Sequence, residues 1–65
     1  MKAQVGDRIV INARNLGEPV REGVVREVHG ADGDPPYVIE WFDNGHTALV
    51  FPGPDAHVVP KKPAA

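Results

Sequence analysis

Glycine and proline interrupt this chain at intervals that leave no room for a helix. Seven of each occur among 65 residues, mostly in clusters between short runs rich in valine, isoleucine and aromatic residues. No window with helical periodicity is free of such a break, and β-branched or aromatic runs bounded by turn residues are typical of strands. The sequence therefore predicts an all-β domain with strands at residues 5–11, 23–29, 37–42, 47–51 and 56–59.

Two local signals set the expected details of the sheet. Asn44-Gly45 follows the third strand and predicts a two-residue type I′ hairpin, because both residues tolerate positive φ. Gly23 begins the second strand, where a glycine usually marks a bulge or a bend. A bulge at Gly23 would exchange the residues of this strand that point inward with those that point outward. The sequence therefore does not decide which face of the second strand points inward.

A sheet of four or five short strands must cover its edges and one apolar face. A flat sheet leaves two edges exposed, whereas a small closed barrel leaves none. We therefore expect residues 1–59 to form one five-stranded SH3-like β-barrel with short loops, followed by a flexible C-terminal tail at residues 60–65. The expected core comprises Val5, Ile9, Ile11, Val25, Val28, Ile39, Trp41, Leu49 and Val58.

Trp41, the only tryptophan, is expected in the core because tryptophan is highly buried on average. Alternation along the strand then places Tyr37 and Ile39 on the inner face with Trp41 and turns Phe42 outward, beside the Asn-Gly turn. The alternative is that the aromatic residues together, Phe51 included, form a recognition surface. An outward Phe42 is the better candidate for contacting a partner.

The charge of the chain bears on its partners. Seven Lys and Arg against nine Asp and Glu give a net charge of −2. This balance disfavours a dedicated nucleic-acid binder, whose affinity depends on neutralising phosphates. Arg8 and Arg26 form a local basic patch if they share an outer face. The preferred interpretation is that Arg21 and Arg26 pair with nearby glutamates across strands.

Catalytic and metal chemistry have little support in the sequence. The chain has no cysteine and no serine, and Thr47 and Tyr37 carry its only side-chain hydroxyls, so a covalent nucleophile is not expected. His29, His46 and His57 lack the spacing of metal ligands and are expected to be solvated. We therefore expect no enzyme, no metal and no cofactor.

The apolar runs are also too short for a membrane protein. A transmembrane helix needs about 18 or more consecutive apolar residues, and the chain has no such run. The N-terminal residues contain no apolar core before Asp7, so no secretory signal is expected. These features predict a cytoplasmic protein without membrane contact.

Several motifs spread along the chain resemble one protein family. They are Val5-Gly6-Asp7-Arg8, Arg21-Glu22-Gly23-Val24-Val25, Pro35-Pro36-Tyr37-Val38, Trp41 with Asp43-Asn44-Gly45-His46, and Phe51-Pro52-Gly53-Pro54-Asp55-Ala56. Over residues 2–59 the chain resembles small actinobacterial proteins known as domain of unknown function 1918. The resemblance implies a compact SH3-like barrel and implies no activity. Phe42 and Asn44 depart from the family's turn, so the turn is where this chain differs.

The leading hypothesis is a noncatalytic interaction module that binds a protein partner through the loops around Asn15, Pro35 and Asn44. One alternative is weak nucleic-acid binding, in a regulatory or stress-associated role, through aromatic stacking and a basic groove. Another is an accessory subunit whose free sheet edge extends the sheet of a partner. The candidate partner-binding residues are Tyr37, Phe42, Asn44, His46, Arg8 and Arg26.

Overall fold

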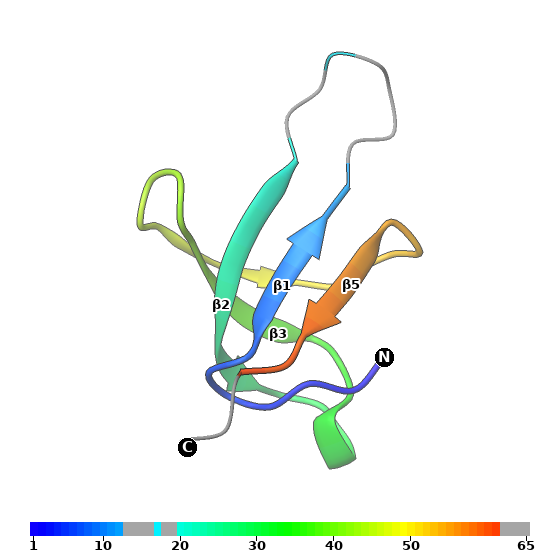
Figure 1. Cartoon of the computed structure of the whole chain (residues 1–65). Helices are drawn as coiled ribbons and strands as arrows, with labels where there is room; N and C mark the ends of the chain where they lie inside the picture. Colours follow the sequence, from blue (N-terminus) through cyan, green and yellow to red (C-terminus); the bar gives the residue numbers. More distant parts are fainter. Residues whose placement is uncertain (13–16, 18–19, 62–65) are drawn as a thin grey trace.

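The computed structural model describes residues 1–12, 17 and 20–61, which fold around a single antiparallel sheet (Figure 1). Its strands are β1 (Arg8–Ile11), β2 (Arg21–Val28), β3 (Tyr37–Trp41), β4 (Thr47–Val50) and β5 (Ala56–Val59), with a 3₁₀ turn, η1 (Ala31–Gly33), between β2 and β3. The all-β prediction is confirmed, and every predicted strand is present. Among the described residues, no helix is long and apolar enough to cross a membrane.

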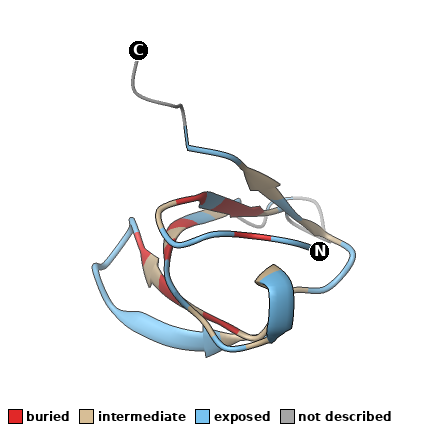
Figure 2. Ribbon diagram, turned by 90° about the horizontal axis from the view of Figure 1, so that it is seen from below, coloured by how far each residue is buried: buried red, intermediate tan, exposed pale blue. Residues whose placement is uncertain are grey.

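The order of strands across the sheet is β4-β3-β2-β1-β5, so the last strand pairs with the first. β1 therefore lies between two neighbours, with Ile9 opposite Gly23 of β2 and opposite Val58 of β5. Within the described ranges no pairing joins β4 to β5. The fold observed is thus a curled five-stranded sheet that remains open between these two strands, and strand pairing alone does not close the predicted barrel (Figure 2).

The segment before β1 crosses one end of the curled sheet (Figures 1 and 2). The N–H of Ala3 donates to the carbonyl of Gly33 at 2.9 Å, and the N–H of Gly6 donates to that of Val25 at 2.8 Å. Ala3 is 4% exposed and belongs to the core. The N-terminal segment therefore covers apolar interior that an open sheet would leave exposed to water.

The core lies inside the curl of the sheet, where buried residues from three strands meet the N-terminal segment (Figure 2). Tyr37, Ile39 and Trp41 contribute from β3, which confirms that Trp41 and Tyr37 share the inner face. The complete buried cluster is Ala3, Ile9, Val25, Tyr37, Ile39 and Trp41, with Ile11, Val28, Val50, Ala56 and Val58 partly buried against it.

Leu49 was expected in the core, and this prediction is wrong. It lies opposite Val38 in β3, whereas Val50 lies opposite the buried Tyr37. Since strand neighbours alternate between faces, Ala48 and Val50 point inward and Leu49 points outward. Its side chain is accordingly 57% exposed.

Val5 is the second wrong core prediction, with 53% of its surface exposed. It belongs to the turn that precedes β1, which begins only at Arg8. The alternation that places Ile9 in the core therefore does not extend back to Val5.

Gly23 is buried at the centre of the sheet, opposite Ile9 on one side and Trp41 on the other. A Cβ atom at this position would lie 2.5 Å from Cγ2 of Ile39 and 2.7 Å from the carbonyl oxygen of Glu40. Both distances are too short for a Cβ atom, so only glycine fits at this position.

The predicted bulge is not at Gly23. The register between β2 and β3 shifts between Val25 and Glu27 instead. Residues three positions apart on a regular strand point to opposite faces. The extra residue of the bulge, Arg26, restores the alternation, so that Val25 and Val28 both contact the core. This shift settles the inward face of β2, which the sequence left open.

Candidate functional site

The β3–β4 loop, residues 42–46, joins the two strands by a wider turn than Asn-Gly predicts. The N–H of Trp41 donates to the carbonyl of His46 at 2.9 Å, and the N–H of Gly45 donates to the carbonyl of Trp41 at 2.8 Å. Gly45 has φ +72°, and Asn44 has no positive φ. The predicted two-residue type I′ turn is therefore wrong: one left-handed residue, a glycine, is enough to reverse this longer loop.

Asn44 stabilises the loop through its side chain. Its Oδ1 atom accepts a hydrogen bond from the N–H of His46 at 2.9 Å. This is a local side-chain-to-backbone bond of the kind that favours asparagine in turns. Asn44 and His46 are both exposed.

Arg21 attaches the same loop to β2. Its Nε and Nη2 atoms each donate to a different carboxylate oxygen of Asp43 at 3.3 Å. Its guanidinium carbon lies 4.1 Å from the centre of the Trp41 ring, a distance at which a cation and an aromatic face attract one another. In addition, the N–H of Phe42 donates to the carbonyl of Glu22 at 2.9 Å. Arg21 thus pairs with an aspartate of the loop and not with a glutamate.

The side chain of Phe42 points away from the core although its backbone is fixed. It is 56% exposed, while the adjacent Trp41 is 7% exposed. The prediction of an outward Phe42 and a buried Trp41 is confirmed. We call Phe42, Asn44 and His46 the loop surface, since all three are exposed on one hydrogen-bonded loop.

Tyr37 cannot belong to an exposed surface. It is 0% exposed, and its hydroxyl donates to the carbonyl oxygen of Gly33 at 2.6 Å, with the carbonyl oxygen of Met1 at 3.3 Å. Burial raises the pKa of this phenol. Its inclusion among the partner-binding candidates is corrected here, because its position on the inner face of β3 leaves no side-chain surface for a partner.

Arg8 and Arg26 lie on the outer face of the sheet, away from the core. Arg26 donates from Nε to a carboxylate oxygen of Glu40 at 2.9 Å, which confirms the expected cross-strand ion pair. Glu40 precedes Phe42 by two residues on the same face of β3. Arg8 lies opposite Val24, and Val24 lies opposite Glu40. One row across the sheet therefore contains Arg8, Val24 and Glu40, next to the loop surface.

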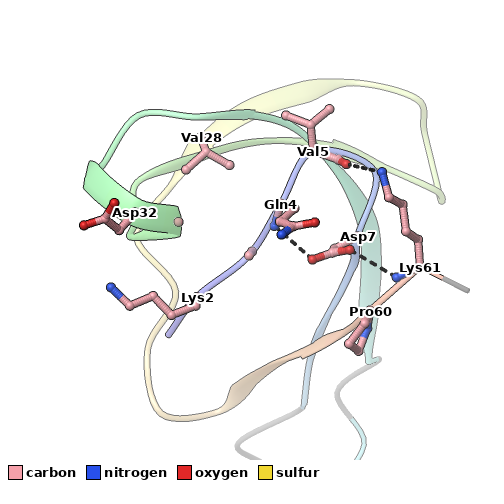
Figure 3. Close-up of a pocket in the computed structure, with 10 residues that line it drawn as sticks. Lys2, Gln4, Val5, Asp7, Val28, Asp32, Pro60 and Lys61 are labelled. Atoms are coloured by element: carbon pink, nitrogen blue, oxygen red, sulfur yellow. Dashed lines mark hydrogen bonds between the residues drawn. The ribbon is translucent and has the colours of Figure 1, made fainter. Parts of the chain in front are cut away.

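A second feature, a hollow of about 750 Å³, lies beside the N-terminal segment and was not predicted (Figure 3). At its wall the carboxylate of Asp7, 6% exposed, accepts the N–H of Gln4 at 2.9 Å and the N–H of Lys61 at 3.1 Å. The Nζ atom of Lys61 donates to the carbonyl of Val5 at 3.2 Å. Ordered structure thus extends into the predicted tail as far as Lys61, and residues 62–65 lie outside the described residues.

Two charged residues that line this hollow, Lys2 and Asp7, already have partners. The ammonium of Lys2 bonds to the Asp34 carboxylate at 2.7 Å, and this hydrogen bond lowers the pKa of Asp34. Both carboxylate oxygens of Asp7 accept backbone N–H groups. Through Asp7, the segment before β1 is bonded to the residue that follows Pro60, so the two ends of the described chain are held together. In the sequence, Asp7 is part of the Val-Gly-Asp-Arg motif at the start of the first predicted strand.

The three histidines are dispersed over the fold. The ring of His29 lies 3.0 Å from a carboxylate oxygen of Glu27, His46 is in the β3–β4 loop and His57 is in β5. In the parts of the chain that the structure describes, no three metal-ligating side chains gather. The loop around Asn15, expected to help bind a partner, lies outside the described residues.

These observations define a small all-β protein with one curled sheet and a hydrogen-bonded loop at one end. The chain belongs to the family described as "Domain of unknown function (DUF1918)", which matches residues 1–58 and confirms the resemblance drawn from its motifs.

Two mycobacterial relatives cover most of the chain. The uncharacterized protein Rv0569 of Mycobacterium tuberculosis is 49% identical over 59 residues, which are 91% of this chain and 67% of that protein. The uncharacterized protein Mb2324 of Mycobacterium bovis is 44% identical over 59 residues, which are 91% of this chain and 74% of that protein. No solved structure matches significantly.

Proposed function

We propose that this protein is a noncatalytic interaction module that binds a protein partner through the loop surface. The observation that carries the proposal is Phe42, a large aromatic side chain that is 56% exposed on a loop whose backbone is hydrogen bonded to its surroundings. Aromatic residues dominate binding hot spots because they bury a large area with few rotatable bonds.

The way the loop is held supports this proposal. The bonds of Arg21 to Asp43 and of Asn44 to His46 fix the loop before any partner arrives. A surface that is already ordered loses less conformational entropy on binding than a mobile one. Asn44 and His46 then offer polar groups around an aromatic centre, which is the usual arrangement of an interface with an apolar centre and a polar rim.

The proposal includes a finer description of the fold. A curled meander whose fifth strand returns to pair with the first supports assignment to the SH3-like barrels, with the N-terminal segment completing the closure. We place the module in the cytoplasm, which the lack of cysteine permits. The proposal assigns no reaction to it, because the chain contains neither cysteine nor serine as a nucleophile.

Affinity capture with matched variants tests the proposed surface. Phe42→Ala removes the aromatic ring, and Phe51→Ala removes a ring that is 73% exposed but lies after β4, outside the loop. We expect a protein captured by the wild type to be retained by Phe51→Ala and lost with Phe42→Ala, while both variants keep the wild-type melting temperature. Equal capture by both variants contradicts the proposal, and a large fall in the melting temperature of Phe42→Ala would make Phe42 a core residue.

Nucleic-acid binding is the second candidate, and Arg8 is the observation that favours it. Arg8 is exposed, and within the described residues it has no ion pair, whereas Arg26 is paired with Glu40. On this account a phosphate of an oligonucleotide would bind Arg8 weakly, and the affinity would fall as salt rises. Absence of binding to a mixed single-stranded DNA and RNA pool at low salt removes this candidate.

A further inference from the structure

The two free edges of the sheet differ in how they are protected. β5 is flanked by Pro54 and Pro60, and Lys61 follows, so proline and positive charge limit its pairing with another strand. β4 is less protected: residues 47–54 carry no charge, and a proline, Pro52, flanks this strand at its C-terminal end only. Three of its four residues are exposed. β4 is therefore the edge that is open to a further strand.

The hydrogen bonding of the hairpin determines which peptide groups of β4 are free. The N–H of Trp41 donates to His46, which makes these two residues a hydrogen-bonded pair. In an antiparallel ladder such pairs alternate with non-bonded ones, so Ala48 and Val50 direct their N–H and C=O groups toward β3. The peptide groups of Thr47 and Leu49 consequently point to the free edge, and continued alternation gives the same direction to those of Phe51.

The same three residues place their side chains on the outer face of β4. Leu49 is 57% exposed and Phe51 is 73% exposed, the latter the highest value among the exposed large apolar side chains of the described residues. Thr47 and Phe51 lie two positions before and two positions after Leu49, so the three residues are spaced symmetrically along the strand. A strand of this kind is complementary to an antiparallel copy of itself.

We propose that β4 is the site at which two copies of this chain pair, antiparallel and related by a two-fold axis at Leu49. In this register Leu49 lies opposite Leu49 of the other copy, and Thr47 lies opposite the other copy's Phe51. Aromatic and β-branched residues placed opposite one another stabilise antiparallel strands. The site adjoins the loop surface, since His46 directly precedes Thr47, but the proposal rests on β4 and does not depend on the partner of Phe42.

A second copy satisfies the charge and hydrogen-bonding requirements of this edge. A two-fold axis brings like groups together, and β4 has no charged residue that would repel its equivalent. Glu40, on the neighbouring strand, is already paired with Arg26. Pro52 has no N–H to donate. If the alternation continues beyond Val50, residue 52 faces β3 as Ala48 and Val50 do, so the missing N–H is not on the side of the other copy. All the outward groups of Thr47, Leu49 and Phe51 thereby find partners.

The extent of the surface sets the expected strength of the pairing. One short strand with Phe51 offers less area than the roughly 1,200–2,000 Å² of specific, stable complexes. We therefore expect a weak dimer in rapid exchange, which becomes populated as the protein concentration rises.

Sedimentation equilibrium of the full chain, from micromolar to millimolar concentration, tests the pairing. Leu49→Lys places two like charges opposite each other at the axis, and His57→Lys is the matched control, a lysine on the other edge strand. We expect the apparent mass to rise with concentration for the wild type and for His57→Lys, and to stay monomeric for Leu49→Lys. A wild type that is monomeric throughout, or a Leu49→Lys variant that associates like the wild type, overturns the proposal.

Cysteine cross-linking tests the register, since the natural chain has no cysteine. Residues paired across the axis have Cα atoms about 5.5 Å apart, within the roughly 4.4–6.8 Å that a disulfide spans. With oxidised glutathione as the oxidant, Leu49→Cys should form a covalent dimer faster than Thr47→Cys, because only residue 49 faces its own equivalent. Equal rates for the two variants would contradict the register.

Discussion

Tyr37 and Phe42 show how position within one strand decides what an aromatic residue does. Tyr37 begins β3 on its inner face and is fully buried, with its hydroxyl bonded to Gly33. Phe42 follows the last residue of the same strand on the opposite face and is more than half exposed. Strand alternation predicted both orientations. It did not predict that the hydroxyl of Tyr37 would join the N-terminal segment to η1, because that contact depends on the tertiary path of the chain.

The buried phenol of Tyr37 predicts a loss of stability in alkaline solution. Burial raises its pKa above the ordinary value of 10.0, so the folded state holds the neutral phenol more strongly than the unfolded chain does. This contribution is complete below the unfolded pKa and is lost as the pH rises through the folded pKa. We expect the free energy of unfolding to fall over that window.

Urea unfolding measured at intervals between about pH 9 and pH 11, where tyrosine titrates, checks this expectation. Tyr37→Phe serves as the control because it has no ionisable hydroxyl. Its stability should change less with pH over the same range, although it starts lower because a buried hydrogen bond is lost. Parallel pH profiles for the two proteins would show that Tyr37 does not cause the alkaline loss.

At the scale of elements, the sequence predicted the strands well and their pairing details less well. The turns rich in glycine and proline located all five strands, because breaks of this kind are local. The inward face of β4 was assigned wrongly, because Leu49 was expected in the core. Only the register with β3 shows that Val50 lies opposite Tyr37. Register, like the bulge after Val25, depends on neighbouring strands and carries no clear signal in a single sequence.

The close approach of strands at Gly23 predicts a severe effect of a small substitution. Gly23→Ala would place a methyl group 2.5 Å from Ile39 and 2.7 Å from the backbone of Glu40. Since β3 cannot move away without losing its pairing with β2, we expect a loss of about 1–3 kcal/mol, the usual cost of overpacking. Chemical denaturation measures this loss.

Gly45→Asn is the matched control for Gly23→Ala. No atom lies within 4 Å of a Cβ atom at Gly45, and its φ of +72° is one that asparagine tolerates. We expect a much smaller change in stability than for Gly23→Ala. If Gly23→Ala loses as little stability as Gly45→Asn, the strands at Gly23 can separate at little cost.

At the scale of the whole molecule, the ends of the described chain stabilise a sheet that strand pairing leaves open. Asp7 accepts hydrogen bonds from Gln4, near the start, and from Lys61, after β5. This carboxylate therefore holds the N-terminal segment against the strand that completes the meander. The sequence indicated the motif around Asp7 but not its partner, since a contact over 54 positions has no local signature.

Removal of this carboxylate should destabilise the whole fold. Asp7→Ala leaves the N–H groups of Gln4 and Lys61 without their acceptor, and we expect a cost of about 1–3 kcal/mol. The comparison is Asp34→Ala, which breaks an exposed pair with Lys2 and should change stability little. Thermal unfolding of both variants separates these effects. If Asp7→Ala melts like the wild type, Asp7 does not hold the ends of the chain together.

The loop surface is the central claim of this account, and an amide NMR titration tests it most directly. Cell lysate depleted of nucleic acid is added to the labelled protein, and a mixed single-stranded DNA and RNA pool is added to a second sample. The account predicts line broadening at Phe42, Asn44 and His46 with the lysate, and its absence in Phe42→Ala. Salt-sensitive shifts with the oligonucleotides around Arg8 and Arg26, together with an unaffected loop in the lysate, would contradict it.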